Sequence, residues 1–378
     1  MIQRHDLIKK VMKEFEVHQV CGLLGPRQCG KTTLAKLIAD KGEYHYFDCE
    51  NSLHLARLED PLLTLGRLSG LIIIDEVQLR PDLFSHLRVL VDEDPQKRFL
   101  ITGSASRDLI SQGSQTLAGR IGFLQITPFT LEEVTDWQHL WKVGGFPKSY
   151  LAKDYTASRR WRDEYIKTFL ERDLAMLGFD FNPVLTSKLW RMLAHYHGQI
   201  LNYAELAYAL GADQRTIKKY IYALEGTFMI RLLKPWFSNM GKREVKTPKV
   251  FIRDTGLLHR LLQIHEDDIE NHPKRGFSFE SFVIENLYEL LDSYEDAYFW
   301  AQHSGAELDF LINFQGQKLG FEIKMTDKPT ITASIKTSLE VLKLDKIFII
   351  TPHKGVFDLS DKVSALGIED IVPYFKAF

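Results

Sequence analysis

The sequence contains the octapeptide GPRQCGKT at residues 25–32, directly after the apolar run from Gln19 to Leu24. The octapeptide matches the pattern G-x-x-x-x-G-K-[ST], and the residues from Lys31 to Ala39 have helical spacing. Glycines let the backbone of such a loop curl, so that successive N–H groups point at phosphate oxygens. The order strand, loop, helix therefore predicts a loop that holds the phosphates of a nucleotide.

The residues of this loop have different expected roles. Lys31 reaches the β- and γ-phosphates, and the Thr32 hydroxyl ligates Mg²⁺. We expect the nucleotide to contact a set of consecutive residues, namely Gly25, Pro26, Arg27, Gln28, Cys29, Gly30, Lys31, Thr32 and Thr33. The sequence contains no guanine-binding N-K-x-D pattern, which favours ATP over GTP. Because Cys29 lies inside the loop, a further hypothesis is that thiol oxidation affects ATP binding.

Two later apolar runs end in polar residues that suit the same site. The run LIIIDE ends at Glu76, and the run FLITGS ends at Ser104. Asp75 suits the role of holding Mg²⁺ through water, and Glu76 is placed to polarise the attacking water. In ATPases with a strand between the two nucleotide-binding strands, the position of Ser104 senses the γ-phosphate, with Thr102 as the competing choice.

An arginine after a glycine, in LAGR at residues 117–120, is a candidate arginine finger. Arg120 would stabilise charge on the γ-phosphate, either within its own chain or in a neighbouring subunit. The alternative is a plain surface arginine, which would contribute little.

Composition sets the class of protein. The 378 residues suit two or three domains, and 48 basic against 50 acidic residues neither demand nor exclude nucleic acid. Three cysteines cannot form a disulfide framework, which favours a reduced, cytoplasmic protein. We expect no signal peptide and no membrane association, because the first residues lack an apolar core and no apolar run is long enough.

The middle of the chain has the pattern of a helix-turn-helix. A helix is expected from Asn202 to Gly211, and a second from Asp213 to Glu225, followed by a wing strand from Thr227 to Leu233. Six basic residues between Lys234 and Arg253 suggest contact with phosphates. The candidate DNA-binding residues are Arg215, Lys218, Lys219, Lys242 and Arg243. The alternative is a unit that only packs between domains.

The C-terminal part combines carboxylates with a lysine. Asp309 lies on a predicted strand, and Glu322 and Lys324 lie two apart on the next strand, so they share one sheet face. A helix upstream carries Glu280 on its flank. With the helix and strand that follow, this order resembles the PD-(D/E)XK nuclease fold, which implies that Asp309 and Glu322 bind Mg²⁺, Lys324 orients water and Glu280 is an auxiliary acid. The alternative is a surface hairpin with alternating charges.

The whole chain resembles the bacterial and archaeal AAA-type ATPases that carry a C-terminal domain of unknown function. The resemblance rests on GPRQCGKT, LIIIDEVQ, FLITGSAS, LAGR, GGFP, YIKTFLERDL, the helix from Thr216 to Glu225, PKVFIRDTGLL, ELDF and FEIK. It implies an α/β chain: an AAA-type P-loop NTPase parallel sheet, then a helical winged-helix-like region, then a small α/β restriction-endonuclease-like domain. The boundaries expected are 1–140, 141–250 and 251–378.

Three functions remain open from the sequence. The first is an ATPase, with ATP and Mg²⁺ as cofactors, that acts on DNA or is regulated by it. The second is an ATP-dependent signalling or defence switch that binds a protein partner and uses the nuclease-like domain as a scaffold. The third is a Mg²⁺-dependent DNA nuclease controlled by ATP. A homo-oligomer is a further expectation, because an arginine finger can act between subunits.

Overall fold

A computed structural model describes residues 2–40, 42–105, 115–237, 247–291, 296–302 and 305–377. The chain divides into two compact units. The first unit comprises Met1–Pro128, Thr168–Phe181 and Ile221–Met229, and the second comprises Phe129–Lys167, Asn182–Tyr220 and Ile230–Phe378. The boundaries expected near residues 140 and 250 stay predictions.

The first unit contains a parallel sheet. Its strands are β1 (Val20–Leu24), β2 (Tyr44–Asp48), β3 (Leu71–Asp75), β4 (Arg98–Gly103) and β5 (Ile121–Gln125). Within the described residues the order is β2-β3-β4-β1-β5, and every neighbouring pair is parallel. The expected parallel sheet is therefore confirmed, and β4 lies between the two strands that lead to the phosphate loop and to Asp75.

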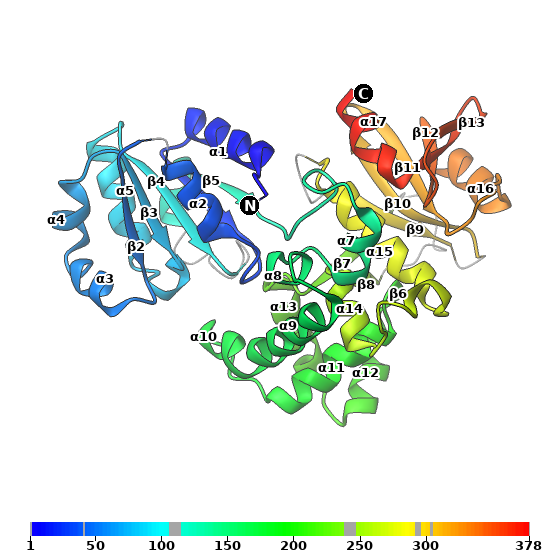
Figure 1. Ribbon diagram of the computed structural model, residues 1–378, viewed down its shortest axis with the longest axis horizontal. Helices are drawn as coiled ribbons and strands as arrows, with labels where there is room; N and C mark the ends of the chain where they lie inside the picture. The colour runs from blue at the N-terminus through cyan, green and yellow to red at the C-terminus, as the bar shows by residue number, and fades with distance from the viewer. Residues whose placement is uncertain are drawn as a thin grey trace. The chain divides into compact units, whose positions relative to one another are not determined.

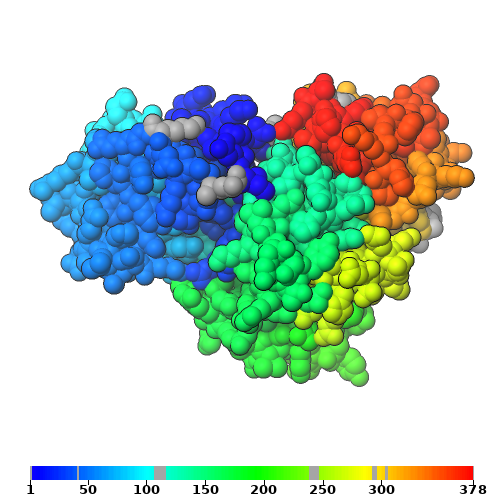
Figure 2. All heavy atoms as spheres, in the orientation of Figure 1, coloured from blue at the N-terminus to red at the C-terminus, as the bar shows by residue number. Residues whose placement is uncertain are grey.

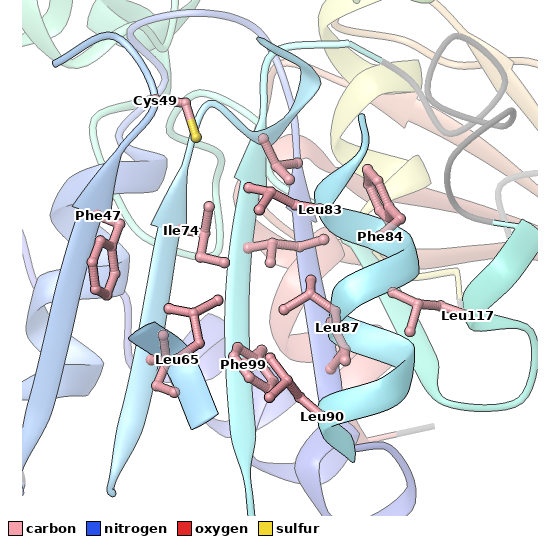
Figure 3. Close-up of a cluster of buried hydrophobic side chains, with 14 of the residues drawn as sticks. Phe47, Cys49, Leu65, Ile74, Leu83, Phe84, Leu87, Leu90, Phe99 and Leu117 are labelled. Atoms are coloured by element: carbon pink, nitrogen blue, oxygen red, sulfur yellow. The ribbon is translucent and has the colours of Figure 1, made fainter. Parts of the chain in front are cut away.

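Helices pack on this sheet because its strands are apolar on both faces. They are α1 (His5–Val17), α2 (Lys31–Ala39), α3 (Ser52–Arg57), α4 (Pro61–Gly66) and α5 (Leu83–Glu93). Figure 3 shows α5 laid along the strands, with Leu87 and Leu90 directed at Phe99. These side chains and Ile74 are fully or almost fully buried, so this apolar contact fixes α5 on one face.

Two distant segments complete the first unit. The π-helical turn η3 (Phe169–Asp173) and the short helix α10 (Leu174–Met176) belong to residues 168–181. Leu177 and Phe228 pack against the buried core of the first unit. No local sequence pattern indicates that these residues beyond 140 belong to the nucleotide-binding unit.

The second unit begins with helices. They are α7 (Trp137–Val143), α8 (Pro147–Tyr150), α9 (Tyr155–Thr168), α11 (Pro183–His195), α12 (Tyr203–Leu210) and α13 (Gln214–Gly226), and the ends of α9 and α13 reach the first unit. The Asn202 side chain caps α12 by accepting from the Glu205 N–H, and Gly211 ends it at φ 61°. Both predicted helices therefore form, and the first has the two caps that were predicted for it.

A mixed sheet runs through the second unit. Its strands are β6 (Gln199–Ile200), β7 (Ile230–Pro235), β8 (Lys249–Ile252), β9 (Ala297–Ala301), β10 (Glu307–Phe314), β11 (Gln317–Ile323), β12 (Lys346–Thr351), β13 (Val356–Ser360) and β14 (Val363–Gly367). In the described residues their order is β13-β14-β12-β11-β10-β9-β7-β8-β6. β7 and β9 pair in parallel, so the strands of the expected regions 141–250 and 251–378 form one sheet.

The C-terminal elements follow the predicted order of helix, strands, helix and strand. α15 (Arg275–Tyr288) precedes β9, and α16 (Ala333–Leu342) connects β11 to β12. β10 and β11 are antiparallel, and β11 and β12 are parallel. α14 (Thr255–Leu261) lies before α15, and α17 (Ile371–Ala377) ends the described chain. In Figure 1, α17 (red) lies beside β11 and β12, and its Phe375 ring contacts Phe321 and Phe348 of these strands. Figure 2 shows the C-terminal residues as a group of orange and red spheres.

Among the residues that the structure describes, every helix is too short or too polar to cross a bilayer.

Candidate functional site

The phosphate loop joins β1 to α2. Gly30 stands at the N-cap of α2 with φ 103°, a conformation that favours glycine. A Cβ added to Gly25 would lie 2.0 Å from the Ile126 carbonyl oxygen, so a side chain at this position has no room. The two glycines of the motif are therefore required by backbone geometry, one for a left-handed residue and one for a close approach.

Lys31 folds back over the loop. Its Nζ donates to the carbonyl oxygens of Gly25 and Pro26, both at 2.8 Å, and the side chain is buried. The ammonium group thus lies within the curl of the loop. The phosphate oxygens of a bound nucleotide would offer it stronger, charged acceptors at the same place.

Asp75 lies at the end of β3, beside the start of α2. Its Oδ2 accepts from the Thr32 hydroxyl at 2.8 Å and from the Tyr46 hydroxyl at 2.6 Å, and its Oδ1 accepts from the Thr102 hydroxyl. A carboxylate and a hydroxyl in contact are the oxygen ligands that Mg²⁺ prefers, so this pair fits a magnesium ion. Sequence reasoning missed Tyr46, because no motif surrounds this tyrosine on β2.

Glu76 and Ser104 lie at the same sheet edge. Glu76 has a left-handed backbone, φ 54°, which is uncommon for a residue other than glycine and is typical of functional sites. Its N–H donates to the Thr102 hydroxyl at 3.2 Å. The amide Nε2 of Gln78 donates to Glu76 Oε2 and, at 3.0 Å, to Ser104 Oγ. Both candidate sensor residues, Thr102 and Ser104, thus lie beside the carboxylates.

Arg120 lies at the other end of the sheet. Its carbonyl accepts from the N–H of Val20, the first residue of β1, whereas the phosphate loop follows the last residue of that strand. Its guanidinium donates to both carboxylate oxygens of Asp92, at 2.6 and 3.0 Å. A finger role within its own chain is excluded by this placement, so only the role in a neighbouring subunit stays a prediction.

Two arginines fix the loop, and their partners could not be read from the sequence. Arg4 is buried and donates to the carbonyl oxygens of Cys29 at 3.2 Å and Thr127 at 2.9 Å. Arg27 forms ion pairs with Glu50 and, at 2.6 Å, with Asp173. The predicted nucleotide-contacting Arg27 is therefore held by carboxylates of the protein itself.

Cys29 is fully buried, and its Sγ lies 3.5 Å from the Ile126 carbonyl oxygen. The hypothesis of a thiol-sensitive loop stays untested, and this burial limits direct access of a reagent to the sulfur.

The C-terminal carboxylates come together as the sequence predicts, with one difference. Asp309 on β10 and Glu322 on β11 are buried, and Lys324 Nζ lies 2.8 Å from Glu322 Oε1. Asp309 Oδ2 accepts from the Ile323 N–H at 2.8 Å. Glu280, expected on the flank of its helix, is buried, because α15 is buried along most of its length. It faces a charged partner inside the protein, and its role as an auxiliary acid stays a prediction.

That partner is Lys249 on β8. Its Nζ lies 3.7 Å from Glu280 Oε1 and forms an ion pair with Glu307. The Arg253 side chain is 10% exposed and pairs with Glu285 at 2.9 Å. Two of the six basic residues expected to contact DNA phosphates are therefore used inside the second unit, because β8 is an internal strand of the large sheet. Lys242 and Arg243 lie outside the described residues.

Burial shapes the charges of this carboxylate group. Burial raises the pKa of Glu280 to about 8 and, with the charge of Asp309, the pKa of Glu322 to about 7. Burial also raises the pKa of Asp309. Glu280 Oε1 and Glu322 Oε2 are buried without a hydrogen-bond partner among the described residues. In the same part of the chain, no three His, Cys, Asp or Glu side chains are arranged to hold a metal ion.

The expected DNA-reading helix α13 has one exposed stripe. Arg215, Lys218 and Lys219 are exposed, whereas Ile217 and Tyr220 are buried as predicted. Lys218 Nζ lies 5.3 Å from the centre of the Tyr203 ring. In the chain, β6 precedes α12 and β7 follows α13. Both strands pair antiparallel with β8.

Three family models match successive parts of the chain. Residues 17–135 match the AAA domain. Residues 134–268 match a domain of unknown function, DUF8612, and residues 275–371 match another, DUF4143. The first unit is therefore an AAA-type P-loop ATPase domain, while the nuclease-like character of the C-terminal part remains an expectation.

Relatives cover nearly the whole chain. The uncharacterized proteins Rv2008c of Mycobacterium tuberculosis and Mb2031c of Mycobacterium bovis are each 44% identical over 98% of this chain and 85% of their own length. The chain belongs to the family of these mycobacterial proteins. The shared length includes all three matched regions, so the family joins an AAA domain to the two domains of unknown function.

Two solved structures are similar to part of this chain at low identity. The Walker-type ATPase PABY2304 of Pyrococcus abyssi is 15% identical, covers 69% of this chain and 96% of its own, and gives a TM-score of 0.48. The RuvB Holliday junction branch migration motor of Thermotoga maritima is 16% identical over 70% of this chain and 96% of its own, with a TM-score of 0.30.

Proposed function

We propose that this chain hydrolyses ATP in its first unit and that the nucleotide state controls how its second unit holds DNA. The observation that carries the ATPase is the convergence of Lys31, Thr32, Asp75 and Glu76 at one sheet edge. Carboxyl ends of parallel strands are where α/β sheets bind ligands. Cys21, Cys29 and Cys49 are buried free thiols, which supports a cytoplasmic location.

Each residue has one task in this mechanism. The loop N–H groups and Lys31 bind the phosphates, and Thr32 and Asp75 would hold Mg²⁺. A bound magnesium ion would neutralise charge on the β- and γ-phosphate oxygens. Glu76 accepts a proton from the attacking water, and Ser104 or Thr102 donates to the γ-phosphate. Arg120 would act on the nucleotide of a neighbouring subunit, which requires a homo-oligomer.

The DNA role is supported by the arrangement around α13. Helix α11, strand β6, helices α12 and α13, and strands β7 and β8 follow the order of a winged helix. Arg215, Lys218 and Lys219 lie on the exposed stripe of the helix that would enter the major groove. A basic stripe of this kind would contact phosphates and give binding that falls steeply with salt.

The decisive experiment is ATP turnover by the full chain with and without single- and double-stranded DNA, at several salt concentrations. We expect DNA to stimulate turnover and high salt to remove the stimulation. Lys31→Ala should lose nucleotide binding, and Glu76→Gln should bind ATP yet hardly hydrolyse it. Absence of ATP binding by the wild type would refute the ATPase, and stimulation unaffected by salt would refute the DNA role.

A protein partner is the competing occupant of the second unit. The observation that favours it is the internal use of Lys249 and Arg253, which leaves fewer basic groups for phosphates. Turnover that is stimulated by a partner protein and unchanged by DNA would support this ATP-dependent switch, with the C-terminal domain as a scaffold.

A Mg²⁺-dependent nuclease is the second candidate activity. The observation that favours it is the buried Oε2 of Glu322, which has no hydrogen-bond partner among the described residues. A cation is a natural partner for such an oxygen. Asp309 and Glu322 would hold Mg²⁺ and Lys324 would orient water. Cleavage of DNA with Mg²⁺ should be lost in Asp309→Ala, and equal cleavage by both proteins would reject the site.

A further inference from the structure

A side chain with no role in the proposed mechanism links two parts of the ATPase site. Gln78 belongs to the 3-10 turn η1 (Val77–Leu79), which follows the Asp75–Glu76 pair directly. The left-handed backbone of Glu76 turns the chain at this point, so that the side chain two residues later returns to the sheet edge. Its Nε2 donates to Glu76 Oε2 at 2.5 Å and to Ser104 Oγ at 3.0 Å.

The orientation of this amide follows from its neighbours. A carboxylate oxygen accepts only, so the nitrogen of the Gln78 amide must face Glu76. Both amide hydrogens are then used, one on Glu76 and one on Ser104. Because Ser104 accepts this bond through its oxygen, its own hydrogen is left to donate, and a γ-phosphate oxygen is a suitable acceptor.

The oxygen of the amide has no partner in the protein. Gln78 Oε1 is buried and has no hydrogen-bond partner among the described residues. Buried polar atoms normally have a partner, and one without a protein partner needs an explanation. A glutamine that joins Glu76 to Ser104 at the sheet edge suits a role in the reaction.

We propose that Gln78 is a positioning residue for ATP hydrolysis, which holds Glu76 toward the attacking water and couples it to Ser104. This inference rests on the proposed ATPase function. One oxygen of Glu76 is fixed by the amide, so the other is directed at the water. With Ser104 rather than Thr102 as the residue that contacts the γ-phosphate, the orientation of Glu76 depends on the presence of that phosphate. Nucleoside diphosphate would leave this coupling incomplete.

The test compares the full-length wild type with Gln78→Leu, and with Gln96→Leu as a control at an exposed glutamine. A fluorescent ATP analogue measures binding, and single-turnover assays measure hydrolysis. We expect Gln78→Leu to bind ATP within about threefold of the wild type and to hydrolyse it about 10- to 100-fold more slowly, as misplaced catalytic groups do. The control should match the wild type in both assays.

A double-mutant cycle separates positioning from general damage. If Gln78 acts through Glu76, adding Gln78→Leu to Glu76→Gln should slow hydrolysis less than twofold further. Hydrolysis by Gln78→Leu within twofold of the wild type would overturn the inference while leaving the ATPase intact. Parallel loss of binding and hydrolysis would show a structural residue and also overturn it. A wild type that hydrolyses no ATP would refute the proposed function, and this inference with it.

Discussion

Arg27 of the phosphate loop donates to Asp173 at 2.6 Å, across 146 residues of sequence. Asp173 lies in the π-helical turn near the start of residues 168–181. This segment belongs to the first unit, although the residues before and after it belong to the second. π-helical turns are frequent at functional sites. The contact therefore links the nucleotide-binding loop to a segment by which the chain enters the ATPase unit again and then leaves it.

The Arg27–Asp173 pair should hold this segment in place. Burial raises the pKa of Asp173 in spite of Arg27, whereas the charges of Asp173 and Glu50 raise the pKa of Arg27 against burial. The two shifts oppose each other, so the net contribution of the pair is modest. We expect Asp173→Asn to lower the unfolding free energy by about 1–2 kcal/mol, between values for exposed and buried pairs.

Hydrogen exchange measures the local effect. Amides of residues 174–178 should exchange faster in Asp173→Asn than in the wild type. Asp163→Asn is the control, because Asp163 pairs with Arg260 at an exposed position. Unchanged exchange in the Asp173 variant would contradict the role of the pair.

Tyr46 should support magnesium binding. Its hydroxyl donates to Asp75 Oδ2, the oxygen that also contacts Thr32. Tyr46→Phe removes this bond while keeping the ring, and loss of such an outer contact typically weakens metal binding about 10- to 100-fold. The Mg²⁺ concentration that gives half-maximal ATP turnover should rise accordingly. Tyr44→Phe, on the same strand and exposed, should behave like the wild type.

Arg120 should act only between subunits. Because it lies at the sheet end away from the phosphate loop, Arg120→Ala is expected to bind ATP as the wild type does. Its turnover should fall, and turnover per molecule in the wild type should rise with protein concentration. Mixing Arg120→Ala with Lys31→Ala should restore activity, because each supplies what the other lacks. No recovery on mixing would leave Arg120 as a surface residue paired with Asp92.

His259 should make the second unit sensitive to acid. Its Nδ1 lies 3.1 Å from the Lys142 carbonyl oxygen and its Nε2 lies 2.6 Å from Ser278 Oγ, which suits a neutral ring with the proton on Nδ1. Burial lowers the pKa of His259 to about 4, and the charge of Arg162 adds to the effect. The unfolded state therefore binds more protons between about pH 6.5 and pH 4, so stability from this group is lost as pH falls through that range.

The expected loss is about 3 kcal/mol at most, from the difference between the two pKa values. It is measured as the difference in unfolding free energy between the wild type and His259→Gln, at pH 7 and at pH 4. Asp254, whose pKa burial raises to about 6, acts in the opposite direction but equally in both proteins. A difference that does not shrink toward pH 4 would contradict the prediction.

Much of the ATPase unit could be predicted because its signals are local. The motif from Gly25 to Thr32 needs two glycines for backbone reasons that hold in any fold with this loop. Asp75 and Glu76 end an apolar strand, and strand ends of a parallel sheet meet at one edge. The spacing of Asp309, Glu322 and Lys324 also predicted that they share one sheet face, because side chains on a strand alternate between the two faces.

What the sequence by itself determined is thus the set of elements and the residues that each carries to a strand or helix end. Only the tertiary structure decided which charges are used internally: Arg27 with Asp173, Lys249 with Glu280, and Arg120 with Asp92. An arginine or lysine has the same local pattern whether it faces solvent, DNA or a buried carboxylate. Its partner depends on contacts between segments more than 25 residues apart, which no local spacing encodes.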